Sequence, residues 1–129
     1  MLHAFRDDER RRITVTASGT VSFVDLVTFL ERQLAGDAWR YAVLHDARAA
    51  TTDVTAQDLS EVVGHIDEIA TIRGRGPVAV VSTYERYVTT AKIYADMLNL
   101  GGGRIAVFSN IMEASDWLDR QNGRILSSV

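Results

Sequence analysis

Apolar and polar side chains alternate near the start of the chain. Apolar residues at positions 13, 15 and 17 are separated by hydroxyl-bearing residues at 14, 16 and 18, which is the period of a strand buried on one face. Residues 2–6 form a second short segment, and the charged residues 7–10 between the two segments are typical of a turn. We therefore predict an antiparallel hairpin of residues 2–6 and 13–17, with Gly19 ending the second strand.

Three later segments, residues 41–44, 78–81 and 105–108, are continuously apolar. Continuous apolar runs favour strands that are buried on both faces, as in parallel sheets. The first run ends in His45 and Asp46, and residues 47–54 after it are expected to form a polar loop.

Helix signals follow the hairpin and each apolar run. Ser22 and Asp25, and again Thr55 and Asp58, have the spacing of an N-cap and an N3 residue. Glycine-containing segments end the first three predicted helices, and Asn122-Gly123 ends the fourth, which begins near residue 111. The side chains expected on the inward faces are Leu26, Phe29, Leu30, Gln33 and Leu34, then Leu59, Val62, Val63, Ile66, Ile69 and Ala70, then Tyr84, Val88, Ala91, Ala95 and Leu98, and finally Ala114, Trp117 and Leu118.

The order of these elements predicts the fold class. Strands that alternate with helices indicate a parallel sheet with right-handed crossovers, and the hairpin adds one antiparallel strand. We expect an α/β fold with a five-stranded mixed sheet, an N-terminal hairpin followed by parallel βα units. The chain of 129 residues has the usual size of one domain, so residues 1–129 are expected to form a single domain.

Composition excludes several classes of protein. The chain has no cysteine, which removes disulfides and thiolate chemistry. The net charge of −3 provides no basic field for nucleic acid. No apolar run approaches the roughly 20 residues of a membrane helix, and the N-terminus lacks a signal-peptide core. We expect a cytoplasmic protein with no membrane span, no nucleic-acid partner and no cofactor.

The carboxyl edge of the predicted sheet is the best candidate for a ligand site. Ligands of open parallel sheets bind beyond the carboxyl ends of the strands, where helix N-termini present free N–H groups to anions. The alternative is that the hydroxyl and amide side chains at this edge are ordinary N-caps. The candidate ligand-binding residues are Asp46, Arg48, Ser82, Thr83, Tyr84, Ser109 and Asn110.

Other constellations favour structural interpretations. Glu61, His65 and Glu68 share helical spacing, but a solvated charged stripe explains them better than a metal site. His45 and Asp46 are adjacent on a strand and point to opposite faces, so they do not form an acid–base pair. The glycine-rich segments precede strands, whereas phosphate-binding loops follow them. We predict no metal site and no catalytic residues.

Two tyrosines of the third predicted helix, Tyr87 and Tyr94, lie off its expected apolar stripe. Tyrosine combines a large apolar ring with a polar tip and is enriched at interfaces. We interpret the pair as candidate partner-binding residues, with lining of a pocket or half-buried packing as alternatives.

The C-terminal stretch carries a family resemblance. Residues 104–108 followed by Glu113-Ala114-Ser115-Asp116-Trp117-Leu118 resemble the ending of SpoIIAA-like proteins, small bacterial proteins with the fold of STAS anti-sigma factor antagonists. The order of the central elements is also similar to that of SpoIIAA-like proteins. It consists of a strand ending in Asp46, a capped helix from Thr55, and a strand over residues 78–82 that leads into a tyrosine-bearing helix. The resemblance implies a mixed sheet with helices largely on one face, and a binding or regulatory role.

One family feature is missing. Phosphorylated STAS antagonists carry an Asp-Ser-Ser-Gly type motif where the second helix starts, but residues 49–55 contain neither serine nor glycine. The phosphosite is therefore not carried over, and we expect no switching by phosphorylation there. Our first hypothesis is a non-enzymatic module that binds a protein partner or itself as a homodimer. The alternative is a binder of a small-molecule or lipid-like ligand in the crevice at the carboxyl ends of the strands.

Overall fold

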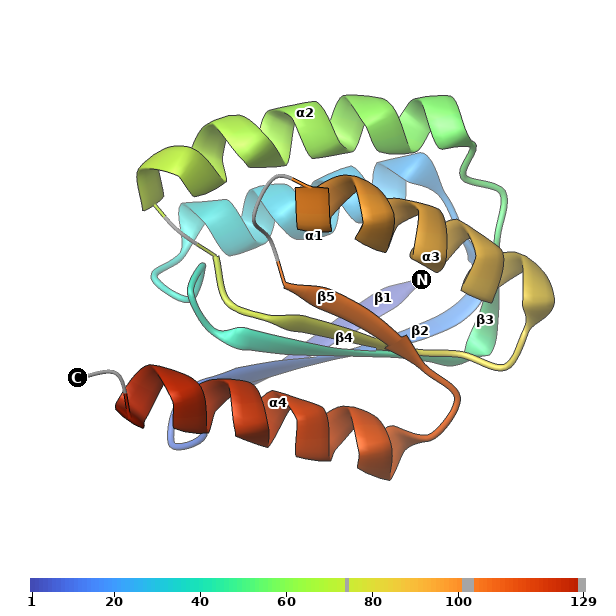
Figure 1. Cartoon of the computed structure of the whole chain (residues 1–129). Helices are drawn as coiled ribbons and strands as arrows, with labels where there is room; N and C mark the ends of the chain where they lie inside the picture. Colours follow the sequence, from blue (N-terminus) through green and yellow to red (C-terminus); the bar gives the residue numbers. More distant parts are fainter. Residues whose placement is uncertain (74, 101–103, 128–129) are drawn as a thin grey trace.

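The computed structural model describes residues 1–73, 75–100 and 104–127, and the side chains of these residues except 67–73, 100 and 122–127. The elements follow one another as β1 (Leu2–Asp7), β2 (Arg12–Val21), α1 (Phe23–Ala35), β3 (Ala42–Thr52), α2 (Ala56–Arg73), β4 (Val78–Val81), α3 (Glu85–Leu100), β5 (Ile105–Phe108) and α4 (Ile111–Ser127). Figure 1 shows them as one sheet between two helical layers.

The five strands form a mixed sheet in which spatial order equals chain order, β1-β2-β3-β4-β5. β1 pairs antiparallel with β2, with Ala4 opposite Val15, and every later pairing is parallel, with His45 opposite Val80. The predicted fold class and the predicted hairpin are confirmed.

Three helices cover one face of the sheet and one covers the other (Figure 1). Crossovers between neighbouring parallel strands are right-handed, so strands that advance in one direction place α1, α2 and α3 on the same face. α4 follows the last strand and leads to no further strand, and it packs on the opposite face. Among the residues that the structure describes, no helix is long and apolar enough to cross a membrane.

Each face of the sheet has its own apolar core. The larger core fills the space between the sheet and α1–α3, with Val15, Val43 and Val80 supplied by the strands. The smaller core lies under α4, where Leu118 and Ala114 pack on β3 and β4. Alternate residues of β3 and β4 contribute to the two cores, as expected for strands buried on both faces.

Arg12, at the start of β2, fastens α4 to the sheet. Its side chain is buried, and its guanidinium donates to Ser115 Oγ at 3.0 Å and to Asp119 Oδ1 at 2.7 Å. Arg12 ends a run of three arginines, residues 10–12. The sequence gives no sign of its burial, because periodicity alone does not show that the helix after β5 lies across the start of β2.

Both predicted helix N-termini are confirmed. Ser22 Oγ accepts from Asp25 N at 3.2 Å while the Asp25 carboxylate accepts from Ser22 N at 3.0 Å, which is a capping box. Thr55 and Asp58 make the same reciprocal pair at the start of α2, with both bonds at 3.1 Å.

Two boundary predictions are wrong. Residues 47–52, expected as a loop, continue β3, because β2 also continues through Gly19 to Val21 and pairs with them. A register shift between Thr16 and Ser18 accompanies this extension, and Gly19 adopts φ +65° inside the strand. α4 likewise runs past Asn122-Gly123 to Ser127, because an interior glycine weakens a helix by only about 1 kcal/mol.

The inward stripe of α3 also differs from the prediction. The buried residues are Tyr87, Ala91, Ala95 and Leu98, while Tyr84 is 53% exposed before the first turn of the helix. The predicted stripe therefore began one turn too early on a residue outside the helix, and it left out Tyr87. Ile69 and Ala70, expected on the inward face of α2, lie outside the described side chains.

Candidate ligand-binding cavity

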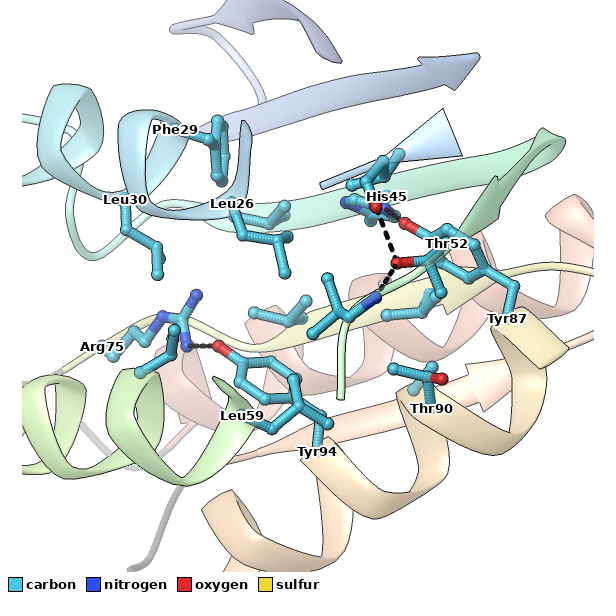
Figure 2. A pocket seen from close by; sticks show the side chains of 17 residues that line it. Leu26, Phe29, Leu30, His45, Thr52, Leu59, Arg75, Tyr87, Thr90 and Tyr94 are labelled. Carbon is cyan, nitrogen blue, oxygen red and sulfur yellow. Dashed lines mark hydrogen bonds between the residues drawn. The ribbon is translucent and has the colours of Figure 1, made fainter. Parts of the chain in front are cut away.

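A cavity of about 80 Å³ lies between the sheet and the three helices α1–α3, and it is partly open to solvent. Figure 2 shows it from close by, with side chains arriving from every one of these elements. The lining residues are Val21, Leu26, Phe29, Leu30, Val43, His45, Thr52, Val54, Leu59, Val62, Arg75, Val78, Val80, Tyr87, Thr90, Ala91 and Tyr94.

The walls are mainly aliphatic because of how the sheet is built. Strands buried on both faces turn every second side chain toward α1–α3, and in β3 and β4 these are Val43, Val78 and Val80. α1 and α2 supply Leu30 and Val62 to the opposite wall. The hydrogen-bonded polar side chains of the lining fall into three sets, a His45–Tyr87 pair, Thr52 and an Arg75–Tyr94 pair.

His45 and Tyr87 form one polar pair. His45 Nε2 and Tyr87 Oη are 2.5 Å apart, and the two side chains are 8% and 6% exposed. Burial lowers the pKa of His45 to about 4 and raises the pKa of Tyr87 above its ordinary value, because a low dielectric disfavours each charged form. At neutral pH both groups are therefore uncharged and hydrogen-bonded to each other.

Thr52 closes the cavity beside this pair. Its hydroxyl donates to the Val21 carbonyl at 2.7 Å and accepts from Val54 N at 3.2 Å. The hydroxyl is thus occupied by backbone groups, and it ties the end of β3 to the end of β2. The role of Thr52 here is to hold the wall in place.

Arg75 and Tyr94 form the second polar pair. Arg75 Nη1 donates to Tyr94 Oη at 3.5 Å, and the guanidinium lies 5.1 Å from the centre of the Trp39 ring. The Arg75 Nε atom is buried and has no hydrogen-bond partner. Figure 2 shows this pair and the His45–Tyr87 pair in separate parts of the cavity, with aliphatic side chains between them.

Gly76 fixes the position of the segment that carries Arg75. A Cβ atom at this position would collide with the backbone carbonyls of Arg40 and Tyr41, so only glycine permits this close approach. The next residue strengthens the contact, since Val43 N donates to the Pro77 carbonyl at 2.9 Å.

Gly76→Ala should therefore lower the free energy of unfolding by roughly 1–3 kcal/mol, the usual cost of overpacking. Gly64→Ala is the matched control, because a Cβ at Gly64 on helix α2 would meet nothing within 4 Å, and the change should stabilise by about 0.5–1 kcal/mol. Urea denaturation of both variants checks this. Equal and small effects at the two positions would contradict the steric argument.

The residues predicted at the carboxyl edge do not line this cavity or the second one, a groove between β1 and α1. Asp46 and Arg48 pair with each other, with Arg48 Nε and Nη2 at 2.9 and 2.8 Å from the two carboxylate oxygens. Hydrogen bonds from the Arg48 side chain and backbone, together with the guanidinium charge, hold the pKa of Asp46 below its usual range.

Among the remaining edge residues, Asn110 is an N-cap, as the structural alternative requires, and Ser82 stabilises the turn before α3. Ser82 Oγ accepts from Tyr84 N at 3.2 Å, and Asn110 Oδ1 accepts from Met112 N at 2.8 Å and Glu113 N at 3.2 Å. Thr83 and Ser109 are exposed. Binding of an anion at this edge stays a prediction. The candidate ligand-binding cavity lies elsewhere, between the sheet and α1–α3.

Tyr87 and Tyr94 both line the cavity, which matches the pocket alternative. The partner-surface interpretation is wrong for Tyr87, because its side chain is buried, and Tyr94 is partly buried. Glu61 and His65 are exposed on α2, and Glu68 lies outside the described side chains.

Sequence reasoning missed His45 and Arg75 as cavity residues. His45 was placed at the carboxyl edge of the sheet next to Asp46, and Arg75 was assigned to the turn that ends the second predicted helix. A signal was available for His45, since a polar residue ending a run predicted to be buried on both faces needs a buried partner. For Arg75 no local pattern was available, because its surroundings come from distant segments.

Comparison with solved structures finds this architecture in a protein from Shewanella loihica PV-4, described as an uncharacterised protein of the DUF3478 family with a SpoIIAA-like fold. The two chains share 17% identity at a TM-score of 0.56, and the match covers 92% of each. The SpoIIAA-like resemblance is thereby confirmed at the level of the fold. No protein-family profile and no curated protein matches the chain.

Proposed function

We propose that this SpoIIAA-like domain is a non-enzymatic binding module whose cavity holds a small, mainly apolar ligand. The observation that carries the proposal is the cavity itself, an opening of about 80 Å³ walled by aliphatic side chains within the larger core. Protein interiors are close-packed, with few voids larger than a water molecule. An aliphatic space of this size lowers stability when empty, and an apolar ligand restores the missing contacts.

The size of the cavity limits the ligand. An engineered apolar cavity of about 150 Å³ binds benzene. The present cavity, at about 80 Å³, therefore encloses an apolar group smaller than benzene. Since the cavity is partly open, the remainder of a longer ligand extends toward solvent. This supports the ligand-binding alternative raised from the sequence, with the site beneath α1–α3 in place of the carboxyl-edge crevice.

The chemistry of the lining supports binding over catalysis. A histidine whose pKa is about 4 is a weak base at neutral pH, and a tyrosine whose pKa is raised is a weak acid, whereas efficient acid–base catalysts have pKa values near the working pH. The Thr52 hydroxyl is already hydrogen-bonded to backbone groups. The neutral His45–Tyr87 pair is suited to orient a ligand.

Octanol binding tests the proposal. Adding octanol should raise the thermal midpoint of the protein in a saturable manner, because a ligand that binds only the folded state stabilises it. Ala91→Leu places three more carbons in the cavity and should weaken octanol binding by about tenfold. Lys92→Leu is the control, since Lys92 is exposed beside Ala91 on the same helix.

Ala91→Val adds a smaller side chain to the cavity and replaces Ala91→Leu in the test if that variant does not fold. It should weaken octanol binding to a lesser degree. Absence of a saturable shift with the parent protein would contradict the proposal. Binding that is equally tight in the parent, the Ala91 variants and Lys92→Leu would place the octanol elsewhere and also contradict it.

A second candidate function, association with a second copy of the chain, is favoured by the free edge of β1. Met1 and Ser18 exchange two backbone bonds, at 2.8 and 3.0 Å. Hydrogen-bonded pairs alternate along an antiparallel ladder, so the backbone groups of Leu2, Ala4 and Arg6 face outward. Phe5 of this edge strand is 68% exposed.

An unpaired edge of this kind is a template for another strand. Light scattering over a concentration series should show a dimer for the parent chain and a monomer for Ala4→Pro. Proline removes the outward N–H without disturbing the bonds to β2, and Ala4→Ser is the control. A parent chain that stays monomeric throughout would rule out the homodimer.

A further inference from the structure

The guanidinium of Arg75 is a cation at an apolar cavity, and no described residue supplies it with an anion. Its polar contacts are the long hydrogen bond to Tyr94 Oη at 3.5 Å and the face of Trp39 at 5.1 Å. None of the carboxylates whose side chains the structure describes forms an ion pair with it. Withdrawing a charge from water is costly unless the charge is paired and hydrogen-bonded.

Unsatisfied donors gather around this residue. Arg75 Nε is buried without an acceptor, and the indole Nε1 of Trp39, whose ring the guanidinium covers, is also buried without one. Both atoms are donors, so neither can satisfy the other. Two unsatisfied donors on side chains in contact indicate that an acceptor is missing from this part of the structure.

Arg12 provides a comparison within the same chain. Its Nε is also unpaired, but its guanidinium has the Asp119 carboxylate at 2.7 Å and the Ser115 hydroxyl at 3.0 Å. The chain therefore supplies an anion to the arginine that fastens α4, whereas Arg75 at the cavity receives none from the described residues. Among the described residues the anion for Arg75 is missing, and a ligand in the cavity can supply it.

We infer that the ligand of the cavity is an apolar monocarboxylate, with its carboxylate bound by the Arg75 guanidinium and its hydrocarbon part lying along the aliphatic walls. This inference rests on the proposed function. Arginine binds carboxylates through two parallel N–H···O bonds, and the Tyr94 hydroxyl beside it is a further donor. Arg75 is the one cationic side chain among the lining residues that the structure describes, since His45 is neutral at pH 7.

The single positive charge also decides between classes of anion. A carboxylate carries one negative charge, which Arg75 neutralises, so no excess charge remains at the apolar wall. A phosphate monoester carries between one and a half and two charges at neutral pH, and the excess would lack a counter-charge from the lining. The cavity therefore favours carboxylates over phosphate esters of similar hydrocarbon length.

Matched probes test the inference. Octanoate and octanol have hydrocarbon chains of similar length, and binding of each to the full chain at pH 8 is measured by isothermal titration calorimetry. We expect octanoate to bind the parent protein about tenfold more tightly than octanol. Arg75→Gln should abolish this preference, so that the ratio of octanoate affinity to octanol affinity falls to about one, while Arg75→Lys should retain part of the preference because it keeps the charge.

The outcomes separate this inference from the proposed function. Octanol binding without a preference for octanoate, or a preference that survives Arg75→Gln, would overturn the carboxylate inference and leave the apolar site standing. Failure of both probes to bind the parent protein would overturn the proposed function itself. If Arg75→Gln does not fold, the parent and Arg75→Lys still decide the question through their octanoate-to-octanol ratios.

Discussion

The free energy of unfolding should fall by about 3 kcal/mol through the titration of His45 as the pH is lowered from 7 to below 4. The pKa of this buried imidazole is about 4 in the folded protein and roughly 6.5 in an unfolded chain. Between these two values the unfolded state binds the proton and the folded state does not, so stability decreases as the pH falls. The full contribution is present above pH 6.5 and is lost below pH 4.

His45→Gln isolates this effect. Glutamine keeps a polar group near the Tyr87 hydroxyl but does not titrate, so urea denaturation of the variant should show a flatter pH dependence between pH 6.5 and 5. Carboxylates with lowered pKa values, including Asp8, Asp25 and Asp46, lose their stabilisation mainly below pH 5 and do so in both proteins. Parallel curves for the parent and the variant in the upper window would show that His45 is readily protonated in the folded state.

Leu118→Ala should lower the free energy of unfolding by about 3–4 kcal/mol. Leu118 is 0% exposed between α4 and the sheet, and truncating a fully buried leucine removes its transfer free energy and leaves a cavity. The core under α4 is the smaller of the two, and the buried side chains that the structure describes in it come from β3, β4 and α4. Few neighbours are therefore available to close the space that the leucine leaves.

Met112→Ala on the same helix is the matched control, because Met112 is 71% exposed and its truncation should change stability by less than about 0.5 kcal/mol. Denaturant titration followed by circular dichroism measures both variants. A Leu118→Ala midpoint close to that of Met112→Ala would mean that α4 contributes little to the folded state.

The fold could be predicted from the sequence because its signals are local. Alternation over residues 13–18, the three apolar runs and the Ser22–Asp25 and Thr55–Asp58 caps each lie within a few neighbouring positions. Prediction failed where the extent of an element depends on contacts with a segment that is distant in the sequence. The continuation of β3 to Thr52 depends on its pairing with the end of β2, which no window around residues 47–54 contains.

The site was harder to predict than the fold for the same reason. The cavity is a space left by side chains of three helices and three strands, and no sequence pattern encodes a space. Its two polar pairs join residues far apart in the chain, 42 positions for His45 and Tyr87 and 19 for Arg75 and Tyr94. Tyr87 was recognised as unusual, but the predicted apolar stripe of α3 left it out because that stripe was begun at Tyr84, before the helix starts.

The identity of spatial and chain order in the sheet, β1-β2-β3-β4-β5, has a consequence for how the molecule assembles. Each new strand pairs with the strand made just before it, so no strand must be inserted between two that have already paired. Pairing between successive strands keeps the sequence separation of partners as small as a helical crossover allows, and folding is faster when that separation is smaller. Synthesis from the N-terminus also presents the strands in the order of their pairing. At every stage of assembly the next strand is added beside the strand formed last. The four-residue strand β5 is therefore the last to join and forms one edge of the sheet, while β1, the first strand, forms the other edge.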